Sequence, residues 1–207
     1  MKKILITGGS QGLGLELCKQ LKGEIHIIDI TSPKEKLNNV IFHKVSVSDK
    51  KVIDILKKIG ELDLVINNAG IMKRESLRDV SLKEFEFIND VNVKGCFLVS
   101  RYVMLKEKGK VVFINSRHGI KLQDTVYSYT KNLMKFIAKS FSKKYDVKEA
   151  YLGPFEGGVS KVGYTKKEYE KREKESVKKI SKLVIELIKS NHKKLIYKEK
   201  IKDYVFK

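Results

Sequence analysis

Cysteine is scarce in this sequence, and long apolar runs are absent from it. The 207 residues include only two cysteines, Cys18 and Cys96, which lie far apart and match no metal-ligand spacing. This argues against a disulfide framework and against a metal site, and the apolar segments around both residues favour buried, reduced thiols. No apolar run approaches the roughly 20 residues that span a bilayer, and the short start Met1–Ile4 does not resemble a signal peptide. We therefore expect a cytoplasmic protein with no membrane partner.

Acidic residues are too few to balance the basic ones, and the formal net charge is +19. Such an excess suggests nucleic acid or a membrane surface as a partner. However, the lysines of residues 166–173 are interleaved with glutamates, as on a solvated helix face. The sequence signatures of helix-turn-helix, zinc-finger and RNA-binding proteins are also absent. The sequence thus argues against a nucleic-acid partner, and a nucleic-acid-associated protein stays an alternative that rests on net charge alone.

Repeats and low-complexity linkers are missing as well. The length is below the roughly 250 residues at which chains divide into domains, and 42% of the residues are hydrophobic. We expect residues 1–207 to form a single domain with a sizeable core.

A glycine-rich turn near the start of the chain organises the rest. An apolar strand over Ile4–Thr7 runs into Gly8, Gly12 and Gly14, and leucines at helical spacing follow. Such a strand, turn and helix let the backbone approach a pyrophosphate, which the N–H groups at the helix N-terminus bind. A glycine-rich turn on its own is a weak signal, because ordinary turns also carry it.

Asp29 ends a second apolar run, Glu24–Asp29, at a position 21 residues after Gly8. A carboxylate at this strand end can accept hydrogen bonds from the ribose hydroxyls of a dinucleotide. It can equally cap the following turn at Thr31–Pro33. Both interpretations stay open.

Strand and helix patterns alternate along the whole chain. Further strands are predicted at Val40–Val47, Leu62–Asn67, Gly109–Ser116, around Ala150 and, as the last one, at Leu195–Tyr197. Helices are predicted after a cap at Ser48 or Asp49, after the capping box Ser81–Glu84, around Tyr127 and over Val177–Ile188. This alternation predicts an α/β fold, a Rossmann-like, doubly wound parallel sheet with helices on both faces. Ligands of such sheets bind at the carboxyl ends of the strands.

Four motifs that occur in order resemble those of the short-chain dehydrogenase/reductase family. They are the turn Thr7–Gly14, the tetrapeptide Asn67–Gly70, the strand that ends at Ser116, and the pair Tyr127-x-x-x-Lys131. Asn92 matches the family's helix asparagine, and the similarity covers residues 3 to about 156. Each motif alone has an ordinary structural explanation, but their joint occurrence is specific.

The resemblance implies a nicotinamide-dependent oxidoreductase that acts on a small-molecule alcohol or carbonyl substrate. It assigns catalysis to Asn92, Ser116, Tyr127 and Lys131, with Tyr127 giving or taking the proton and Lys131 favouring its phenolate. It assigns cofactor binding to Gly8, Ser10, Gln11, Gly12, Leu13, Gly14, Asp29, Val47, Asn68, Ala69, Gly70, Tyr127, Lys131, Gly153 and Phe155.

Asp29 favours NAD as the cofactor, because its charge would repel the 2′-phosphate of NADP. Lys34 and Lys36 follow closely, and NADP therefore stays possible, but we interpret the loop beyond Pro33 as solvated. Val159–Thr165 is much shorter than the family's usual substrate lobe, and we expect this lobe to be reduced. The shortness motivates an alternative function, a dinucleotide-binding sensor or scaffold with little turnover.

The helix after Tyr127 has more apolar residues than packing on one side of a sheet requires. They are Leu133, Met134, Phe136, Ile137 and Phe141. Members of the family commonly pair this helix and the Asn92 helix across a two-fold axis, which implies a homodimer or homotetramer. The alternative is a helix that is buried broadly within its own domain.

Overall fold

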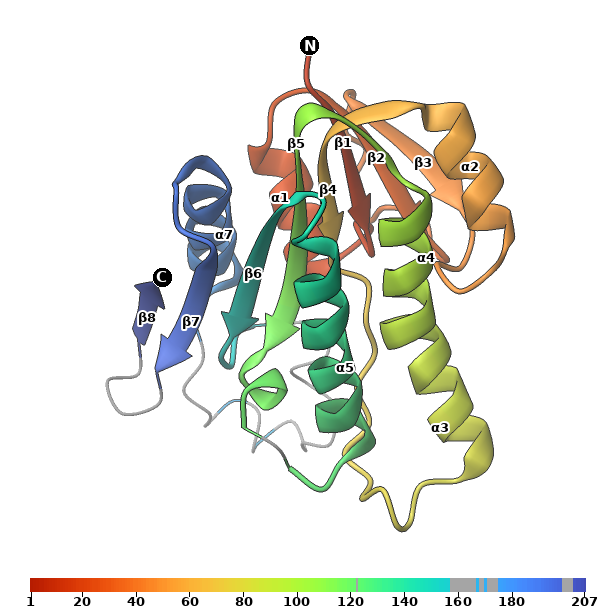
Figure 1. Ribbon diagram of the computed structural model, residues 1–207, viewed down its shortest axis with the longest axis vertical. Helices are drawn as coiled ribbons and strands as arrows, with labels where there is room; N and C mark the ends of the chain where they lie inside the picture. The colour runs from red at the N-terminus through yellow and green to blue at the C-terminus, as the bar shows by residue number, and fades with distance from the viewer. Residues whose placement is uncertain (122, 157–166, 168–169, 171–174, 199–202) are drawn as a thin grey trace.

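The computed structural model describes the chain except for residues 122, 157–166, 168–169, 171–174 and 199–202 (Figure 1). The described residues contain one eight-stranded sheet in the order β3-β2-β1-β4-β5-β6-β7-β8. The strands are β1 (Lys3–Thr7), β2 (Glu24–Asp29), β3 (Val40–Lys44), β4 (Glu61–Asn67), β5 (Met104–Ser116), β6 (Asp146–Leu152), β7 (Lys194–Lys198) and β8 (Asp203–Phe206). The first seven pair in parallel, and β8 is antiparallel to β7.

Helices cover both faces of this sheet, which confirms the doubly wound α/β prediction. They are α1 (Gly12–Gln20), α2 (Lys51–Ile59), α3 (Leu82–Asn89), α4 (Cys96–Tyr102), α5 (Val126–Phe141) and α7 (Val177–Lys189). A π-helix at Asp90–Gly95 joins α3 to α4, and a 3₁₀ turn occupies Arg117–Gly119. The helices α1 and α7 pack on one face, whereas α2, α4 and α5 pack on the other (Figure 1).

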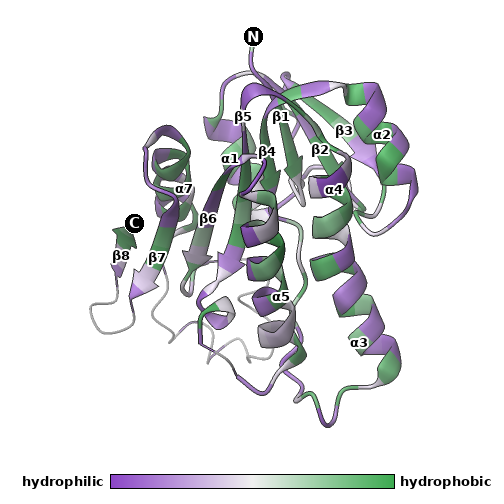
Figure 2. Ribbon diagram, in the orientation of Figure 1, coloured by the Kyte–Doolittle hydropathy of each residue, from purple (hydrophilic) through white to green (hydrophobic). Residues whose placement is uncertain are grey.

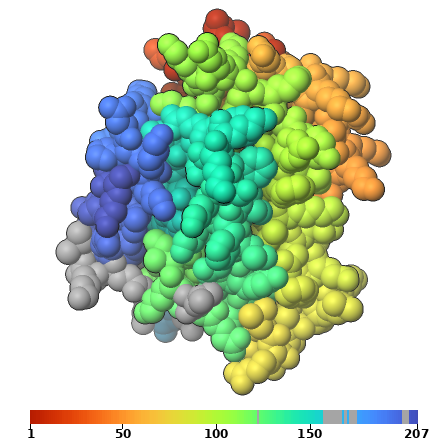
Figure 3. Space-filling view, viewed as in Figure 1, coloured from red at the N-terminus to blue at the C-terminus, as the bar shows by residue number. Residues whose placement is uncertain are grey.

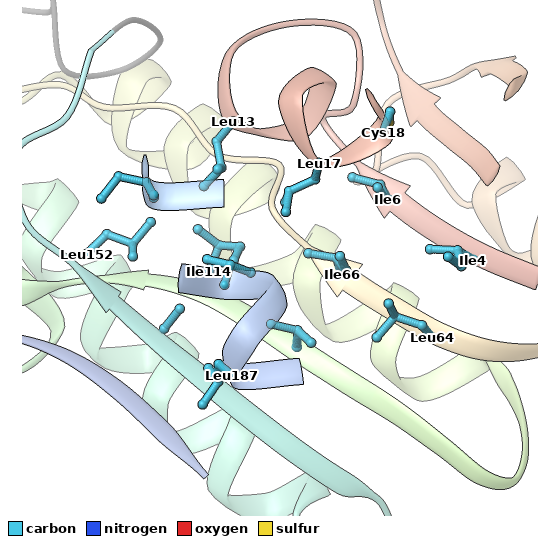
Figure 4. Close-up of a cluster of buried hydrophobic side chains, with 14 of the residues drawn as sticks. Ile4, Ile6, Leu13, Leu17, Cys18, Leu64, Ile66, Ile114, Leu152 and Leu187 are labelled. Atoms are coloured by element: carbon cyan, nitrogen blue, oxygen red, sulfur yellow. The ribbon is translucent and has the colours of Figure 1, made fainter. Parts of the chain in front are cut away.

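The core lies on both sides of the central strands, which are apolar along most of their length (Figure 2). On one side, Ile6 of β1 and Ile66 of β4 lie in a buried cluster with Leu17 of α1 and Leu187 of α7 (Figure 4). Strands that are buried on both faces read as nearly continuous apolar runs, which is why the sequence locates them well. Cys18 and Cys96 are buried free thiols, as predicted.

The segment between β3 and α2 differs from the prediction. β3 ends at Lys44 rather than at Val47. Lys50 stands at the N-cap position of α2 without a side-chain cap hydrogen bond, whereas Asp49 Oδ1 accepts from Lys51 N at 2.9 Å, so the Asp49 carboxylate caps the first turn as the sequence predicted. The Ser46 hydroxyl accepts a hydrogen bond from Ser48 N at 3.3 Å and lies 2.9 Å from the Ser48 hydroxyl. Such local hydrogen bonds compete with a sheet ladder, so a turn replaces the last residues of the predicted strand. By contrast, the Ser81 hydroxyl accepts from Glu84 N at 3.3 Å, and the predicted cap of α3 is confirmed.

The prediction that Leu195–Tyr197 supplies the last strand is wrong, because β8 follows it. Leu195 lies opposite Phe206 in an antiparallel ladder. Tyr204 and Phe206 pack against the α1 and α7 cluster, and this tertiary contact stabilises a run of four residues that is too short to show a clear period. The predicted reduced lobe, Val159–Thr165, and most of the charged run 166–173 lie outside the described residues. In the part of the chain that the structure describes, no helix is long and apolar enough to cross a membrane.

Candidate active site

A cavity of about 630 Å³ opens at the carboxyl ends of β1, β2, β4, β5 and β6. Thirteen of the residues that the sequence predicted to form the site line it together: Gly8, Gln11, Gly12, Leu13, Asp29, Asn68, Ala69, Gly70, Ser116, Tyr127, Lys131, Gly153 and Phe155. This edge is where parallel α/β sheets bind ligands.

The glycine turn has the shape of an anion cradle. Gly12 has a φ of +54°, and a Cβ added to it would meet no atom within 4 Å. At Gly14 an added Cβ would lie 2.1 Å from the carbonyl oxygen of Gly8, so α1 approaches the end of β1 as closely as backbone allows. The side chain of Gln11 makes no capping hydrogen bond at the start of α1, where the first N–H groups have no intrahelical partner. The turn therefore fits the pyrophosphate of a dinucleotide.

Asn68 braces this turn from the neighbouring strand. Its Nδ2 donates to the carbonyl oxygens of Thr7 at 3.0 Å and Gly8 at 2.9 Å. In return, Thr7 Oγ1 accepts from Asn68 N at 3.1 Å and Ala69 N at 3.0 Å. The tetrapeptide after β4 thus fixes the loop that cradles the anion.

Asp29 caps its own turn and also lines the cavity. Its Oδ1 accepts from Ile30 N at 2.7 Å, and its Oδ2 accepts from Ser10 N at 3.1 Å. The turn-capping interpretation is therefore present in the structure, and the contact with ribose stays a prediction. Lys34 lines the same cavity, and its N–H donates to Ser10 O at 3.2 Å. The loop beyond Pro33 is exposed as expected, and Lys34 in this loop is close enough to Asp29 to line the same cavity.

Tyr127 and Lys131 lie one turn apart on α5, whose first turn is capped by the hydroxyl of Thr125. They are 8% and 5% exposed, respectively. Lys131 Nζ donates to Ile114 O at 3.1 Å and lies 5.7 Å from the centre of the Tyr127 ring. Ser116 faces them from the end of β5 and shares a hydrogen bond with Tyr127. The predicted catalytic tyrosine, lysine and serine therefore meet in one buried corner of the cavity.

Burial dominates the titration of this corner. It raises the pKa of Tyr127 to about 12, although the hydrogen bond with Ser116 acts in the opposite direction. It lowers the pKa of Lys131 to about 8. At neutral pH, Tyr127 is therefore a neutral phenol that can donate a proton.

Asn92 lies behind this corner and does not line the cavity. It sits in the π-helix, not in the regular helix that the sequence predicted. Its Oδ1 accepts from Ile71 N at 2.8 Å, and its Nδ2 donates to Ile71 O at 2.9 Å and Thr130 Oγ1 at 3.0 Å. The side chain thereby clamps the loop after β4 to α5. π-Helices are rare and are frequently found at functional sites.

Three predicted cofactor residues also lie outside the cavity lining. Ser10 is buried, and its hydroxyl donates to Thr31 O at 2.6 Å. Gly14 is packed beneath the turn, against Gly8. Val47 packs on the π-helix, since a Cβ added to Gly95 would lie 2.4 Å from Val47 Cγ2.

Several lining residues were missed by the sequence analysis, among them Arg74, Arg117 and His118. Arg117 and His118 directly follow Ser116, so their place after a functional strand end was a usable signal. The His118 ring lies 5.8 Å from the Tyr127 ring in an edge-on arrangement. Arg74 belongs to the loop after β4, and no motif marks it.

Comparisons with known proteins agree with this geometry. The family model described as "short chain dehydrogenase" matches residues 2–172. The 5-keto-D-gluconate 5-reductase of Escherichia coli (strain K12) is 32% identical over 67% of this chain and 63% of that protein. The 2-dehydro-3-deoxy-D-gluconate 5-dehydrogenase of Formosa agariphila is 27% identical over 74% of this chain and 68% of that protein. The chain thus spans less than two thirds of the length of the E. coli relative.

A solved structure has a similar fold. It is a short chain dehydrogenase family protein from Francisella tularensis subsp. tularensis SCHU S4, with a TM-score of 0.79 and 23% identity. The likeness covers 92% of each chain.

Proposed function

The chain belongs to the short-chain dehydrogenase/reductase family, and from this premise we propose that it is an NAD(P)-dependent oxidoreductase. Its substrate would be a small molecule that carries an alcohol or a ketone. The observation that carries the proposal is the buried corner where Ser116, Tyr127 and Lys131 meet on a cavity with an uncapped helix N-terminus.

The chain's own residues would hold the substrate and move one proton. When bound, a nicotinamide cofactor would supply the hydride chemistry at the substrate carbon. The Ser116 hydroxyl would hold the substrate oxygen against Tyr127. In reduction, the Tyr127 hydroxyl donates its proton to that oxygen, and the resulting phenolate lies close to the ammonium of Lys131. In oxidation, the same phenolate takes the proton back from the alcohol.

Asn92 would act by positioning. Its side chain fixes Ile71 and Thr130, and an added Cβ on Gly70 would lie 3.3 Å from Asn92 Oδ1 and 3.6 Å from Lys131 Nζ. The side-chain amide of Asn92 and the ammonium of Lys131 therefore face the same small space beside Gly70. This arrangement suits a proton route that starts at Lys131.

We also propose that two copies pair through α4 and α5. These helices lie side by side on one face of the molecule (Figures 1 and 3). Phe136 of α5 is 65% exposed and Phe97 of α4 is 44% exposed, and exposed aromatic side chains are typical of interfaces. The reduced thiols Cys18 and Cys96 support a cytoplasmic location.

The experiment that tests the proposed function is a panel of alcohols and ketones assayed with NAD and NADP by nicotinamide absorbance. Because the E. coli relative is named for 5-keto-D-gluconate, keto derivatives of sugar acids belong in the panel. Turnover that disappears in Tyr127→Phe supports the proposal. Dinucleotide binding without turnover of any compound would favour a sensor or scaffold, and absence of binding would overturn both functions.

A further inference from the structure

Two uncharged acceptors hold the ammonium of Lys131 in the buried corner. Its Nζ donates to Ile114 O of β5 at 3.1 Å and to Met134 Sδ of α5 at 3.3 Å. An ammonium has three N–H donors, and these two atoms are its acceptors in the part of the chain that the structure describes. The third N–H is therefore left for the cavity, which Lys131 lines together with Gly70.

Met134 is fully buried, and packing fixes its position. It belongs to an apolar cluster with Val111 and Phe113 of β5 and Cys96 of α4. Met134 follows Lys131 by three positions on α5, and residues at this spacing are neighbours on one face of a helix. The thioether therefore offers the ammonium a contact at a fixed place, away from water.

The sulfur fixes this position without strongly compensating the charge. A thioether sulfur is a weak hydrogen-bond acceptor. Burial lowers the pKa of Lys131 to about 8, and the nearby thiol group of Cys96 acts in the opposite direction. Among the described residues, no carboxylate contacts Lys131 Nζ. The positive charge is thus held 5.7 Å from the centre of the Tyr127 ring by neutral partners.

The titratable groups around Lys131 come from several elements. They are Tyr127 on α5, Cys96 on α4 and, along the cavity, Asp29, Arg74, Arg117 and His118. In the described part of the chain, Met134 Sδ hydrogen-bonds to Lys131 and to none of these other groups. A titration that follows the chemistry of residue 134 therefore reports on Lys131.

We propose that Met134 is a positioning residue for proton transfer, whose sulfur holds the ammonium of Lys131 where the phenolate of Tyr127 forms. This inference rests on the proposed function. Because the sulfur is a weak acceptor, the phenolate that forms during reduction meets an ammonium whose charge is still largely uncompensated. Interactions that are stronger in the transition state than in the ground state accelerate a reaction. An oxygen acceptor at this position would instead stabilise the ammonium before the reaction begins.

Two substitutions of opposite chemistry test this role. Met134→Leu keeps the volume and removes the acceptor, whereas Met134→Gln supplies an amide oxygen. Relative to wild type, the fall of kcat/KM for ketone reduction with rising pH should have its midpoint about 0.5 pH units lower in Met134→Leu and about 0.5 pH units higher in Met134→Gln, as a hydrogen bond of ordinary net strength implies. We expect kcat to fall roughly threefold in both.

Ile137 provides the matched control. It lies on the same helix and packs against the same cluster as Met134, but in the described part of the chain it is not a hydrogen-bond partner of Lys131. Ile137→Gln places the same amide in the same surroundings and should leave the midpoint where it is in wild type. A purely structural role of Met134 predicts no shift, or shifts in one direction for leucine and glutamine alike.

A measurement without turnover separates this inference from the proposed function. NMR of the full chain labelled with [ε-¹³C]lysine follows the titration of Lys131, and the signal that Lys131→Arg removes identifies it. The midpoint should again move down in Met134→Leu and up in Met134→Gln.

The possible results are distinguishable. Midpoints that stay unchanged, or that move in one direction in both variants, would overturn the role of Met134 and leave the oxidoreductase intact. If Met134→Gln does not fold, Met134→Leu decides, because an unshifted midpoint in that variant refutes the contact. Absence of turnover across the whole alcohol and ketone panel would overturn the oxidoreductase and with it the proton transfer, while opposite NMR shifts would still support the hold of Met134 on Lys131.

Discussion

Lys131 places its ammonium nitrogen 5.7 Å from the centre of the Tyr127 ring, one helical turn earlier on α5. Burial makes the charged form of each group costly, raising the pKa of Tyr127 to about 12 and lowering that of Lys131 to about 8. Charges interact strongly in such a low-dielectric corner. The hydrogen bond with Ser116 is the contact that lowers the pKa of Tyr127 against this burial, and the nearby ammonium of Lys131 would attract the phenolate once it forms.

Loss of the Tyr127 hydroxyl should remove this proton transfer. We expect Tyr127→Phe to lower kcat by roughly 10²-fold or more, as general acid–base groups typically contribute, while the Kd of the cofactor changes little. Stopped-flow turnover and cofactor titration measure the two quantities. Tyr129→Phe is the matched control, because Tyr129 lies on the same helix but stacks on Phe85 outside the cavity. Turnover that survives in Tyr127→Phe would refute the assigned role.

The pH dependence of reduction should follow Lys131. Its pKa is lowered to about 8, so the ammonium is present below that pH and is lost as the pH rises through it, whereas Tyr127 stays protonated. We expect kcat/KM for ketone reduction to fall as the pH rises through about 8. In Lys131→Arg the guanidinium stays charged, and the fall should disappear in any activity that remains. A fall that persists in this variant would assign it to another group.

Cofactor choice should depend on Asp29 and Lys34, which line the same end of the cavity. Two like charges about 4 Å apart cost on the order of 4 kcal/mol at an effective dielectric of about 20, before screening reduces this repulsion. We therefore predict tighter binding of NAD than of NADP. Asp29→Asn, which keeps an oxygen for the backbone N–H groups, should reduce this preference several-fold. Measuring the Kd of NAD and of NADP at matched salt concentration checks this prediction. If the wild type binds NADP more tightly and Lys34→Ala loses that preference, Lys34 determines the choice of cofactor.

The exposed phenylalanine on α5 should matter for assembly. If α4 and α5 pair two copies, Phe136→Glu buries a charge in that interface and should produce a monomer. Light scattering at micromolar concentration measures the mass of both proteins. Phe87→Glu is the comparison, because this 58% exposed side chain belongs to α3 instead. A wild-type chain that is already monomeric would refute the pairing.

Two glycines of the first turn should respond differently to alanine. In Gly14→Ala the Cβ would collide with backbone, the Gly8 oxygen at 2.1 Å, and we expect the free energy of unfolding to fall by about 1–3 kcal/mol. Gly12→Ala meets no atom within 4 Å and bears only the left-handed strain of about 1–2 kcal/mol, but its methyl enters the anion cradle. Denaturant unfolding together with cofactor titration separates the two effects. Equal stability of Gly14→Ala and wild type would contradict the tight approach seen here.

The sequence predicted best where burial and motif coincide. β1, β4 and the end of β5 are buried on both faces, so their apolar runs indicated strands. Their carboxyl ends carry the polar residues of the site, so the strand pattern and the motifs pointed to the same places in the chain. Tyr127 and Lys131 were predicted from the resemblance to the family's Tyr-x-x-x-Lys pair, whose spacing places both residues on one helix face. β8 was missed because packing of Tyr204 and Phe206 on the core stabilises its four residues. Such a tertiary contact leaves no periodic pattern in the local sequence.

Arg74 and Arg117 were missed for a different reason. They reach the cavity from two separate loops, and such convergence depends on where each loop runs. The π-helix at Asn92 was missed because π-helices are rare and because the bonds of the Asn92 side chain to Ile71 and Thr130 are tertiary contacts. In both cases the site is made by tertiary placement rather than by local sequence.

The antiparallel pairing of β8 with β7 protects one edge of the sheet from self-association. An open edge strand is a template for self-association, because its unpaired N–H and C=O groups accept a strand from another chain. Here β8 covers the five residues of β7, and β8 itself, which forms the edge of the sheet on this side, is only four residues long. Proteolytic loss of β8 would therefore uncover the Leu195–Tyr197 edge of β7 and favour self-association of the chain.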